Sequence, residues 1–360
     1  MTVLVISDEF PPYSGGAGFV GKQIVEGLFM NKHEVELLTS YRVKKEQNDL
    51  KVNNILWIHK VKFIWVISYF CKLFFLSWKK YDAIILNDAN SVLPFMFFFK
   101  KKVREKTTII IHGTTIIDNS KKLNNFFYRR FNSLFERLLK DVKYVVGVSD
   151  FMSQYIKKSY PILENIKSWN PGVSYDIFKN LKITVKKDPD KLTLLTVSRI
   201  VVKKGYNEMY KLFKEIHGIN SKYRWNIVGT GLYLNEFREK IKSEGYEDYI
   251  FFYEHKLRVE LANLYSNADV FILLSNFEES LGLVYLEAQY FGLPVISNNK
   301  GGSKEIINKK TGYLIDDIKD AYTILINEKF TDLNADEIKA NARNYSSNNS
   351  IIKLEKIIFL

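Results

Sequence analysis

The 360-residue sequence is poor in cysteine, histidine and proline, with one, five and seven residues respectively. The single cysteine, Cys71, excludes an internal disulfide and fits a reducing cytoplasm; it stands in an apolar stretch, where we expect it to be packed and inert. Scattered histidines and one cysteine give no zinc-binding pattern, and we predict no metal site. No P-loop is present, and no GxGxxG opens the first helix, which argues against nicotinamide chemistry.

The sequence also lacks a recognisable leader and a long apolar run. MTVLVISDEF indicates a short buried strand and an acidic turn, so we expect no secretion signal and a cytoplasmic protein. Residues 63–78 are too short for the ~20 apolar residues of a spanning helix, and Lys72 interrupts them. Three interpretations stay open: a helix packed in the first domain, one that also touches a bilayer surface, and a span.

Acidic residues are scarce in the first half only. Residues 1–173 hold 26 Lys and Arg against 15 Asp and Glu, a net charge of +11, whereas residues 174–360 hold 27 against 25, a net of +2. Residues 92–106, VLPFMFFFKKKVREK, join an aromatic run to a basic cluster, as an interfacial anchor or a buried helix with a solvated basic end would. A basic domain attracts phosphates, an anionic bilayer or nucleic acid, and charge alone does not choose.

Short apolar runs rich in β-branched residues recur along the chain, separated by segments with helical spacing. They occupy 3–7, 35–39, 83–86, 108–112 and 144–149, then 192–198, 225–229, 250–254, 270–275 and 294–298. Such runs indicate buried parallel strands, and their alternation with helices indicates doubly wound α/β sheets.

The pattern restarts after residue 190, so we predict two Rossmann-like domains facing each other across a cleft. The first spans 1–177, a polar linker follows at 178–190, and the second spans 191–344. A helical tail, 345–360, is apolar enough to dock. Ligands of such folds bind at the carboxyl ends of the strands.

The sharpest chemical pattern is SNFEESLGLVYLEAQYFGLP, residues 275–294. A strand ends, a turn carries Glu279 and Gly282, and the following helix carries Glu287. The backbone N–H groups of Gly282, Leu283 and Val284 would point at a ligand over the helix start, where the helix dipole favours a phosphate. Two carboxylates beside a phosphate site suit sugar hydroxyls at each end of the ligand, although an acidic first turn with one exposed Glu is the plain structural alternative.

This stretch resembles the signature of family 4 retaining glycosyltransferases, E-x-[FL]-G-L-x-x-x-E-A. TVSRIVVKKG (196–205) is similar to the loop that places an Arg and a Lys on the donor diphosphate, here Arg199 and Lys204. FPPYSGGAG (10–18) resembles the glycine-rich loop that approaches the donor, with Gly15 and Gly16. NPGVSYDIFK (170–179), NADVFILLS (267–275) and GGSKEII (301–307) resemble other family segments.

In IIIHGTT, relatives place a histidine beside the sugar, which assigns His112 to the site, although Gly113 stands where they often have Asp. The resemblance covers nearly the whole chain and implies the GT-B fold, with the tail crossing back to the first domain. It implies transfer of a hexose-type sugar from a nucleoside diphosphate donor, UDP-sugar favoured, with retained configuration and no further cofactor. Glu279, Arg199, Lys204 and His112 would be catalytic.

The sequence indicates the acceptor and the cellular location less directly than the fold and the donor. The basic, aromatic first half leads to the hypothesis of a lipid-linked glycan acceptor in cell-surface polysaccharide or lipopolysaccharide synthesis, at the inner face of the plasma membrane. An epimerase of the same architecture, which needs no acceptor, and a non-catalytic partner subunit are the alternatives. Nucleic-acid binding would account for the charge but not for two carboxylates and a diphosphate clamp, so we expect no nucleic-acid partner.

Overall fold

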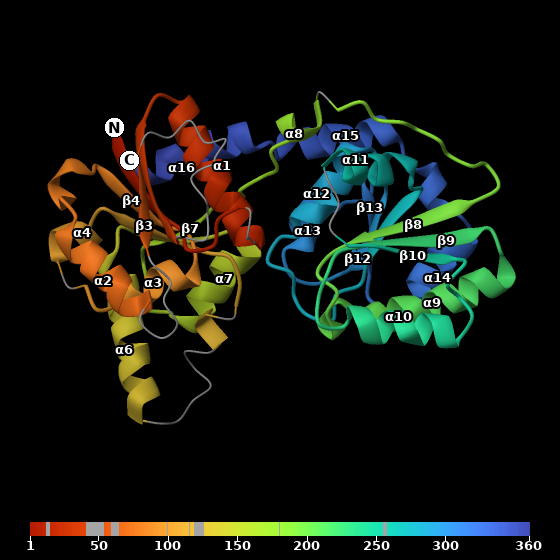
Figure 1. The fold of residues 1–360 in the computed structure, drawn as a ribbon, viewed down its shortest axis with the longest axis horizontal. Coiled ribbons are helices and arrows are strands. Elements are labelled where there is room, and N and C mark those ends of the chain that lie inside the picture. The colour runs from red at the N-terminus through yellow and green to blue at the C-terminus, as the bar shows by residue number, and fades with distance from the viewer. Residues whose placement is uncertain are drawn as a thin grey trace. The chain divides into compact units, whose positions relative to one another are not determined.

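The structure is a computed structural model that describes residues 1–11, 15–40, 54–58, 65–98, 100–114, 116–118, 126–179, 181–254 and 258–360. It comprises two compact units, Met1–Pro171 with Ser347–Leu360 and Gly172–Ser346. Each unit is an α/β structure built on one parallel sheet (Figure 1). The predicted fold class of two Rossmann-like sheets is therefore confirmed.

Among the described residues of the first unit, seven strands form one sheet, in the spatial order β3-β2-β1-β4-β5-β6-β7. They are β1 (Thr2–Ile6), β2 (Glu34–Ser40), β3 (Asn54–Ile58), β4 (Ala83–Leu86), β5 (Thr107–Ile111), β6 (Tyr144–Gly147) and β7 (Ile166–Ser168). The two edge strands, β3 and β7, were not predicted. β7 is short and polar because an edge strand buries little, whereas the NILWI of β3 is apolar enough to have been predicted.

The helices of the first unit lie on both faces of its sheet. They are α1 (Gly16–Met30), α2 (Trp65–Phe75), η2 (Trp78–Lys80), α3 (Ala89–Phe95), α4 (Lys101–Arg104), α6 (Phe126–Asp141), α7 (Asp150–Ser159) and α16 (Ser347–Phe359). Because the strand order reverses between β1 and β4, right-handed connections put α1 on one face and α2 and α3 on the other. The C-terminal helix α16 packs against α1, so closely that a Cβ on Gly27 would lie 2.5 Å from Ile351.

Six parallel strands form the sheet of the second unit, in the order β10-β9-β8-β11-β12-β13. They are β8 (Leu192–Val197), β9 (Tyr223–Val228), β10 (Ile250–Tyr253), β11 (Val270–Leu273), β12 (Val295–Asn298) and β13 (Gly312–Ile315). The helices are α8 (Asp176–Lys179), η3 (Val202–Lys204), α9 (Tyr206–Ile219), α10 (Leu234–Ser243), α11 (Arg258–Asn267), α12 (Leu283–Tyr290), α13 (Ser303–Ile306), α14 (Ile318–Ile326), η4 (Lys329–Asp332) and α15 (Ala335–Asn344). In Figure 1, α9, α10 and α14 lie on one face, and α11, α12 and α13 on the other.

The chain passes from the first unit to the second at Pro171–Gly172 and returns at Ser346–Ser347. The segment expected as a linker, 178–190, belongs instead to the second unit. Its backbone is held by asparagines of α11: Thr184 N–H donates to Asn263 Oδ1 at 2.9 Å, and the Asn267 amide donates to the Thr184 carbonyl at 2.8 Å. The sequence of this segment is polar and charged because the segment runs exposed along α11, not because it is a flexible linker between the units.

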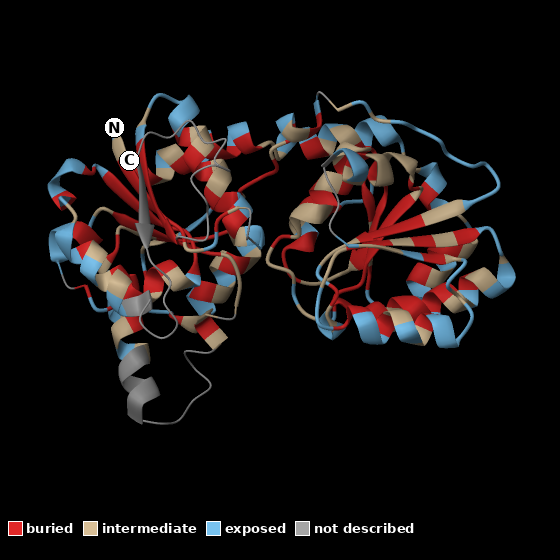
Figure 2. Ribbon diagram, in the orientation of Figure 1, coloured by how far each residue is buried: buried red, intermediate tan, exposed pale blue. Residues whose placement is uncertain are grey.

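The central strands of both sheets are buried, and most exposed residues of the described chain lie on the helices and connections around them (Figure 2). The apolar stretch 63–78 forms α2 and the first residue of η2. Residues 63 and 64 of this stretch lie outside the described ranges. Among the described residues, no helix combines the length and apolarity needed to cross a membrane. The expectation that Cys71 is packed is wrong, because its side chain is exposed on α2.

Candidate active site

Strand order locates the first group of predicted site residues. In the second unit the chain builds β8, β9 and β10 outward and then returns to place β11 on the other side of β8. Such a reversal leaves a crevice beyond the carboxyl ends of the two central strands, where doubly wound sheets bind ligands. Arg199 and Lys204 follow β8, and Glu279 and Gly282 follow β11, so two segments distant in sequence meet at this point.

Gly205 allows the turn after β8 to approach the end of β11 closely. It adopts φ +77°, a left-handed conformation, and a Cβ at this position would lie 1.9 Å from the carbonyl oxygen of Leu274. Across the same contact, Asn276 N–H donates to the Lys203 carbonyl at 2.9 Å. The turn after β8 therefore rests directly on the end of β11, which a residue with a side chain would prevent.

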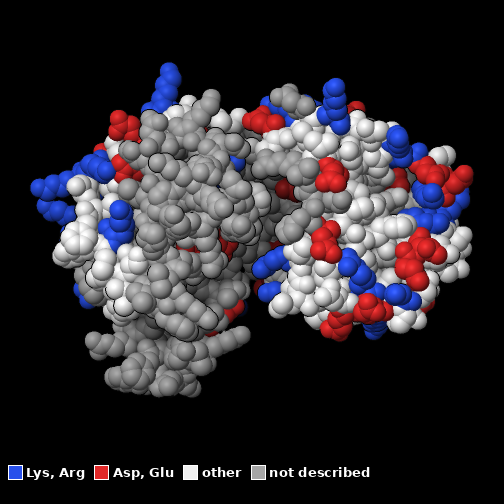
Figure 3. All heavy atoms as spheres, in the orientation of Figure 1, with Lys and Arg blue, Asp and Glu red and all other residues white. Residues whose placement is uncertain are grey.

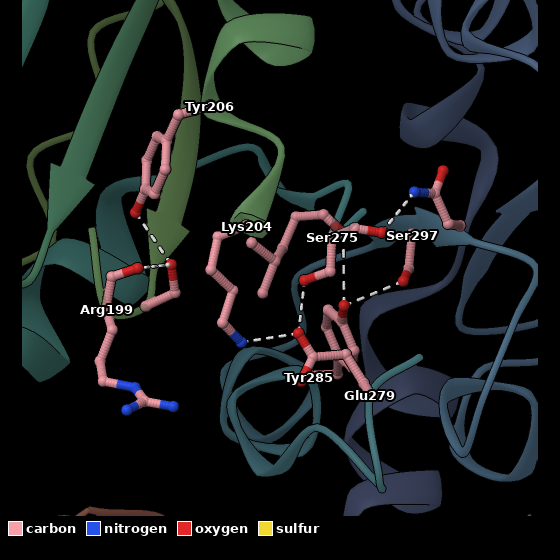
Figure 4. A network of polar contacts seen from close by, with 10 residues as sticks. Arg199, Lys204, Tyr206, Ser275, Glu279, Tyr285 and Ser297 are labelled. Carbon is pink, nitrogen blue, oxygen red and sulfur yellow. Dashed lines mark hydrogen bonds and ion pairs between the residues drawn. The ribbon is translucent and has the colours of Figure 1, made fainter. Parts of the chain in front are cut away.

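Lys204 and Glu279 form an ion pair at this contact (Figure 4), with Nζ 2.6 Å from Oε1. The Ser275 hydroxyl donates to the same carboxylate oxygen. Both charged side chains are largely buried, with 11% and 14% of their surfaces exposed. Within the described part of the chain Oε2 of Glu279 has no hydrogen-bond partner, so this oxygen can accept from a ligand hydroxyl.

Arg199 is the second cation of the predicted clamp and is arranged differently. Its side chain is exposed, and its guanidinium forms no ion pair with any residue that the structure describes. In Figure 4 it extends in the same direction as the ammonium of Lys204. One cation is thus buried and paired while the other is free to move, a combination that suits binding and then release of a diphosphate.

Two consecutive glycines after β12 hold the loop that carries Glu279. Gly302 N–H donates to the Glu279 carbonyl at 2.7 Å, and a Cβ on Gly301 would lie 2.4 Å from that carbonyl oxygen. A Cβ on Gly302 would lie 2.1 Å from the Ser280 carbonyl oxygen. The sequence identified GGSKEII only as a family segment; the pair of glycines two residues after a buried strand was the signal of this role.

Helix α12 begins where the pattern predicted. Gly282 precedes it with φ +86°, and the N–H groups of Leu283 and Val284 belong to its first turn, where no intrahelical acceptor exists. Glu287 lies further along the helix, and its Oε2 accepts from the Tyr265 hydroxyl of α11 at 2.9 Å. Burial, and then the nearby Glu287 carboxylate, raises the pKa of Tyr265 well above its ordinary value, so this tyrosine stays a donor.

A second polar network lies in the first unit, at the corresponding reversal between β1 and β4. The amide of Asn87, which follows β4, donates to Ser7 Oγ at 2.9 Å and to the Ala17 carbonyl in the first turn of α1 at 2.8 Å. Its Oδ1 lies 3.0 Å from Nε2 of His112, which directly follows β5. Asn87 was not predicted, and it connects the loop after β1, the start of α1 and His112.

These contacts fix the tautomer of His112. Because the Asn87 amide group is engaged with a carbonyl, its oxygen faces the ring and must accept from Nε2–H. Nδ1 then carries the lone pair and can accept from a substrate hydroxyl. Burial lowers the pKa of His112 to about 4, whereas burial raises the pKa of the neighbouring Asp88 to about 6. As the pH falls, the lowered pKa of His112 reduces the free energy of unfolding, because the unfolded chain binds that proton more readily. The raised pKa of Asp88 increases it, because the folded chain binds that proton more readily, so the two effects oppose each other.

We therefore expect His112 to stay neutral between about pH 7.5 and about pH 5.5, where a solvated histidine would become charged. The measurement is an NMR titration of protein labelled in its histidine rings, with His112→Gln assigning the resonance. A midpoint near the ordinary value would contradict the burial argument. The Asn87→Asp variant is the matched control, because a carboxylate at this distance should raise the midpoint by at least about one pH unit.

The glycine-rich loop is described only in part, since residues 12–14 lie outside the described ranges. Gly15 precedes α1, and a Cβ there would lie 3.2 Å from Glu9 Oε2. A Cβ on Gly16 would meet no atom of the described residues within 4 Å. Internal packing therefore does not demand glycine at Gly16, which agrees with a role in leaving room for a ligand.

Two known protein families match this chain, one over most of each unit. Residues 14–176 match the family described as Glycosyltransferase Family 4, and residues 178–349 match the family described as Glycosyl transferases group 1. The chain belongs to the glycosyltransferases. This confirms the predicted family.

Two curated relatives of this glycosyltransferase align with part of it. The alpha-monoglucosyldiacylglycerol synthase of Streptococcus pneumoniae is 28% identical over 164 residues, 45% of this chain and 37% of that protein. A GDP-mannose-dependent alpha-(1-6)-phosphatidylinositol monomannoside mannosyltransferase of Mycobacterium tuberculosis is 27% identical over 197 residues, 51% of each. The matches thus span about half or less of the relatives' own lengths.

A solved structure resembles the glycosyltransferase over its whole length. Anabaena Alr3699/HepE, crystallised in complex with UDP, superposes with a TM-score of 0.76 at 16% identity and covers 99% of both chains. At this identity the likeness shows the fold, which is the predicted GT-B class. Within the described ranges of the glycosyltransferase, no three His, Cys, Asp or Glu side chains gather as a metal site would require.

Proposed function

We propose that this glycosyltransferase moves a hexose-type sugar from a nucleoside diphosphate donor, with UDP-sugar favoured, to an acceptor hydroxyl with retained configuration. The observation that carries the proposal is the Lys204–Glu279 pair at the strand reversal, near the start of α12 and the guanidinium of Arg199, which forms no ion pair with a described residue. Cations, a hydroxyl-accepting carboxylate and unpaired backbone N–H groups together match a diphosphate joined to a sugar.

In the proposed reaction the bond between the anomeric carbon and the donor phosphate oxygen breaks, and a bond to the acceptor oxygen forms on the same face. The acceptor proton passes to the departing diphosphate. Arg199 and Lys204 stabilise the negative charge that grows on this leaving group, and the N–H groups of Leu283 and Val284 bind its phosphates. The protein contributes charge and position rather than a nucleophile.

The remaining residues bind the sugar and the ribose. Glu279 accepts from a sugar hydroxyl through Oε2, and Glu287 accepts from the ribose hydroxyls. In the first unit, neutral His112 accepts a hydroxyl hydrogen bond at Nδ1, and Gly15 and Gly16 let the ligand approach the backbone. No metal or further cofactor is part of this proposal.

For the acceptor we propose a lipid-linked glycan used in cell-surface polysaccharide or lipopolysaccharide synthesis. Support comes from the chemistry of the relatives, whose names specify glycosylated diacylglycerol and phosphatidylinositol products or substrates. A basic first half suits an anionic membrane surface. The proposed location is accordingly the cytoplasmic face of a membrane, with nucleic acid excluded as a partner.

The test of the donor is a thermal-shift series with UDP-, GDP- and other nucleotide sugars, on the wild type and on Glu287→Gln. We expect a UDP-sugar to raise the melting temperature selectively, because ligand bound to the folded state stabilises it. The Gln variant keeps an oxygen for Tyr265 but loses the charge, so its ligand-free stability should match the wild type while affinity falls about tenfold.

Three other outcomes have defined meanings. Selective stabilisation by a GDP-sugar would replace the UDP part of the proposal and leave the site intact. Absence of a shift with any nucleotide sugar at millimolar concentration would contradict the proposed donor site. Conversion of a stabilising donor to its epimer without an acceptor would replace transfer by epimerisation.

A further inference from the structure

Helix α2 of the first unit is apolar on two opposite faces, and only one of them is covered. Tyr69 and Leu73 point into the core, with 1% and 0% of their surface exposed. At spacings of four, seven and eight residues along the other face stand Ile67, Cys71, Phe74 and Phe75. Ile67, Phe74 and Phe75 are 61%, 60% and 82% exposed, and Cys71 is exposed as well. A cluster of large apolar side chains exposed on one face of a helix commonly marks an interaction site, so this second face calls for a partner.

The connection from α3 to α4 extends the same surface. Phe97 is 46% exposed, and Lys100, three residues further on, places its ammonium 5.6 Å from the ring centroid of Phe74. Beneath them the surface is firmly supported: the indole N–H of Trp78 donates to the Leu73 carbonyl at 2.9 Å, and the Trp78 and Phe98 rings lie 4.9 Å apart. The exposed rings are therefore fixed on the core rather than carried by a loose loop.

Positive charge surrounds these apolar residues. The lysines near them are Lys79, Lys80, Lys100, Lys101 and Lys102, all exposed. Lys80 pairs with Glu36 and Lys101 with Glu105, whereas Lys79, Lys100 and Lys102 form no ion pair within the described ranges. In Figure 3, Lys and Arg side chains gather at the edge where Figure 1 shows α4.

We propose that this α2 surface, made of Ile67, Cys71, Phe74, Phe75 and Phe97, docks on an anionic bilayer. Aromatic rings held at a surface with free ammonium groups around them match the headgroup region, where rings meet acyl chains and lysines meet lipid phosphates. A second copy of the chain fits less well, because a symmetric contact through this surface would bring two sets of unpaired lysines together. The inference rests on the membrane location proposed above and names the surface responsible for it. It is tested by binding alone, so its failure would leave the proposed transfer reaction standing.

Cys71 supplies the first measurement, because it is the only cysteine of the chain and stands within the α2 surface. The full chain, labelled at this thiol with an environment-sensitive fluorophore, is mixed at low salt with vesicles of one part phosphatidylglycerol to two parts phosphatidylcholine. We expect a blue shift with these vesicles and none with pure phosphatidylcholine. Unchanged fluorescence with the anionic vesicles would overturn the proposal.

The second measurement is vesicle flotation of unlabelled variants. Phe74→Ser/Phe75→Ser should weaken binding about tenfold or more, and Lys100→Gln/Lys102→Gln should make binding measurably less sensitive to salt. Leu232→Ser is the matched control, since Leu232 is 99% exposed in the other unit, and it should bind like the wild type. Equal binding by the double Phe variant would contradict the proposal, as would wild-type self-association that this variant abolishes.

Discussion

Lys204→Gln is expected to lower kcat about 100-fold or more, with a much smaller change in KM for the donor. The reason is that the ammonium of Lys204 would act on charge that appears only as the diphosphate leaves, and such interactions affect turnover more than ground-state binding. Gln is preferred to Ala because its amide can still donate to Glu279, which is largely buried and would otherwise keep only the Ser275 hydroxyl as a donor among the described residues. Steady-state kinetics with the stabilising donor measure the effect.

The neighbouring lysine is the control for this variant. Lys203 lies 5.0 Å from the ring centroid of Phe277, against 4.9 Å for Lys204, but its side chain is exposed and has no ion pair in the described ranges. Lys203→Gln removes the same charge from the same turn and should change kcat by less than about threefold. Similar kcat values for the two variants would show that Lys204 does not stabilise the leaving group.

Gly205→Ala should reduce the free energy of unfolding of the second unit by about 3 kcal/mol or more. Alanine is strained at φ +77°, and its Cβ would lie 1.9 Å from the Leu274 carbonyl oxygen, so the turn after β8 must move off the end of β11. Turnover should fall with stability, because the same movement carries Lys204 away from Glu279. Urea unfolding followed by circular dichroism gives the change in stability.

Gly218→Ala separates this effect from the loss of a glycine as such. Gly218 lies within α9, and a Cβ there meets nothing within 4 Å. Alanine at an open helical position should raise stability by about 0.5–1 kcal/mol. If Gly205→Ala behaved in the same way, the close contact between the two loops would not exist in solution.

The sequence allowed the sheets to be predicted because buried parallel strands are nearly continuous apolar runs. Its failures lie at the edges: β7 has one half-buried and two exposed residues, and in β13 the two central residues are only partly buried. At these two strands the apolar pattern weakens because one side of the strand has no neighbour, whereas the missed edge strand β3 is apolar and has no such explanation. The same limit explains Cys71, since an apolar helix does not reveal which of its faces is covered.

The candidate site shows a different limit. Arg199, Lys204 and Glu279 could be named as charged residues at strand ends, but their pairing could not be predicted. Lys204 and Glu279 are 75 positions apart and meet only because β11 lies beside β8 rather than beside β10. Asn87 and His112 meet for a similar reason, as β4 and β5 are neighbours in their sheet. Contacts of this kind follow from strand order, which the apolar pattern does not contain.

The division of the first unit between both ends of the chain sets the order of events during synthesis on the ribosome. Residues 172–346, including every strand of the second sheet that the structure describes, are synthesised before α16. Until then the outer side of α1 lacks the buried residues Ile351, Leu354 and Ile358 that cover it in the finished molecule. The first unit, although begun first, is therefore the last to be closed, and any chain that stops before α16 leaves that side of α1 open to solvent and to chaperones.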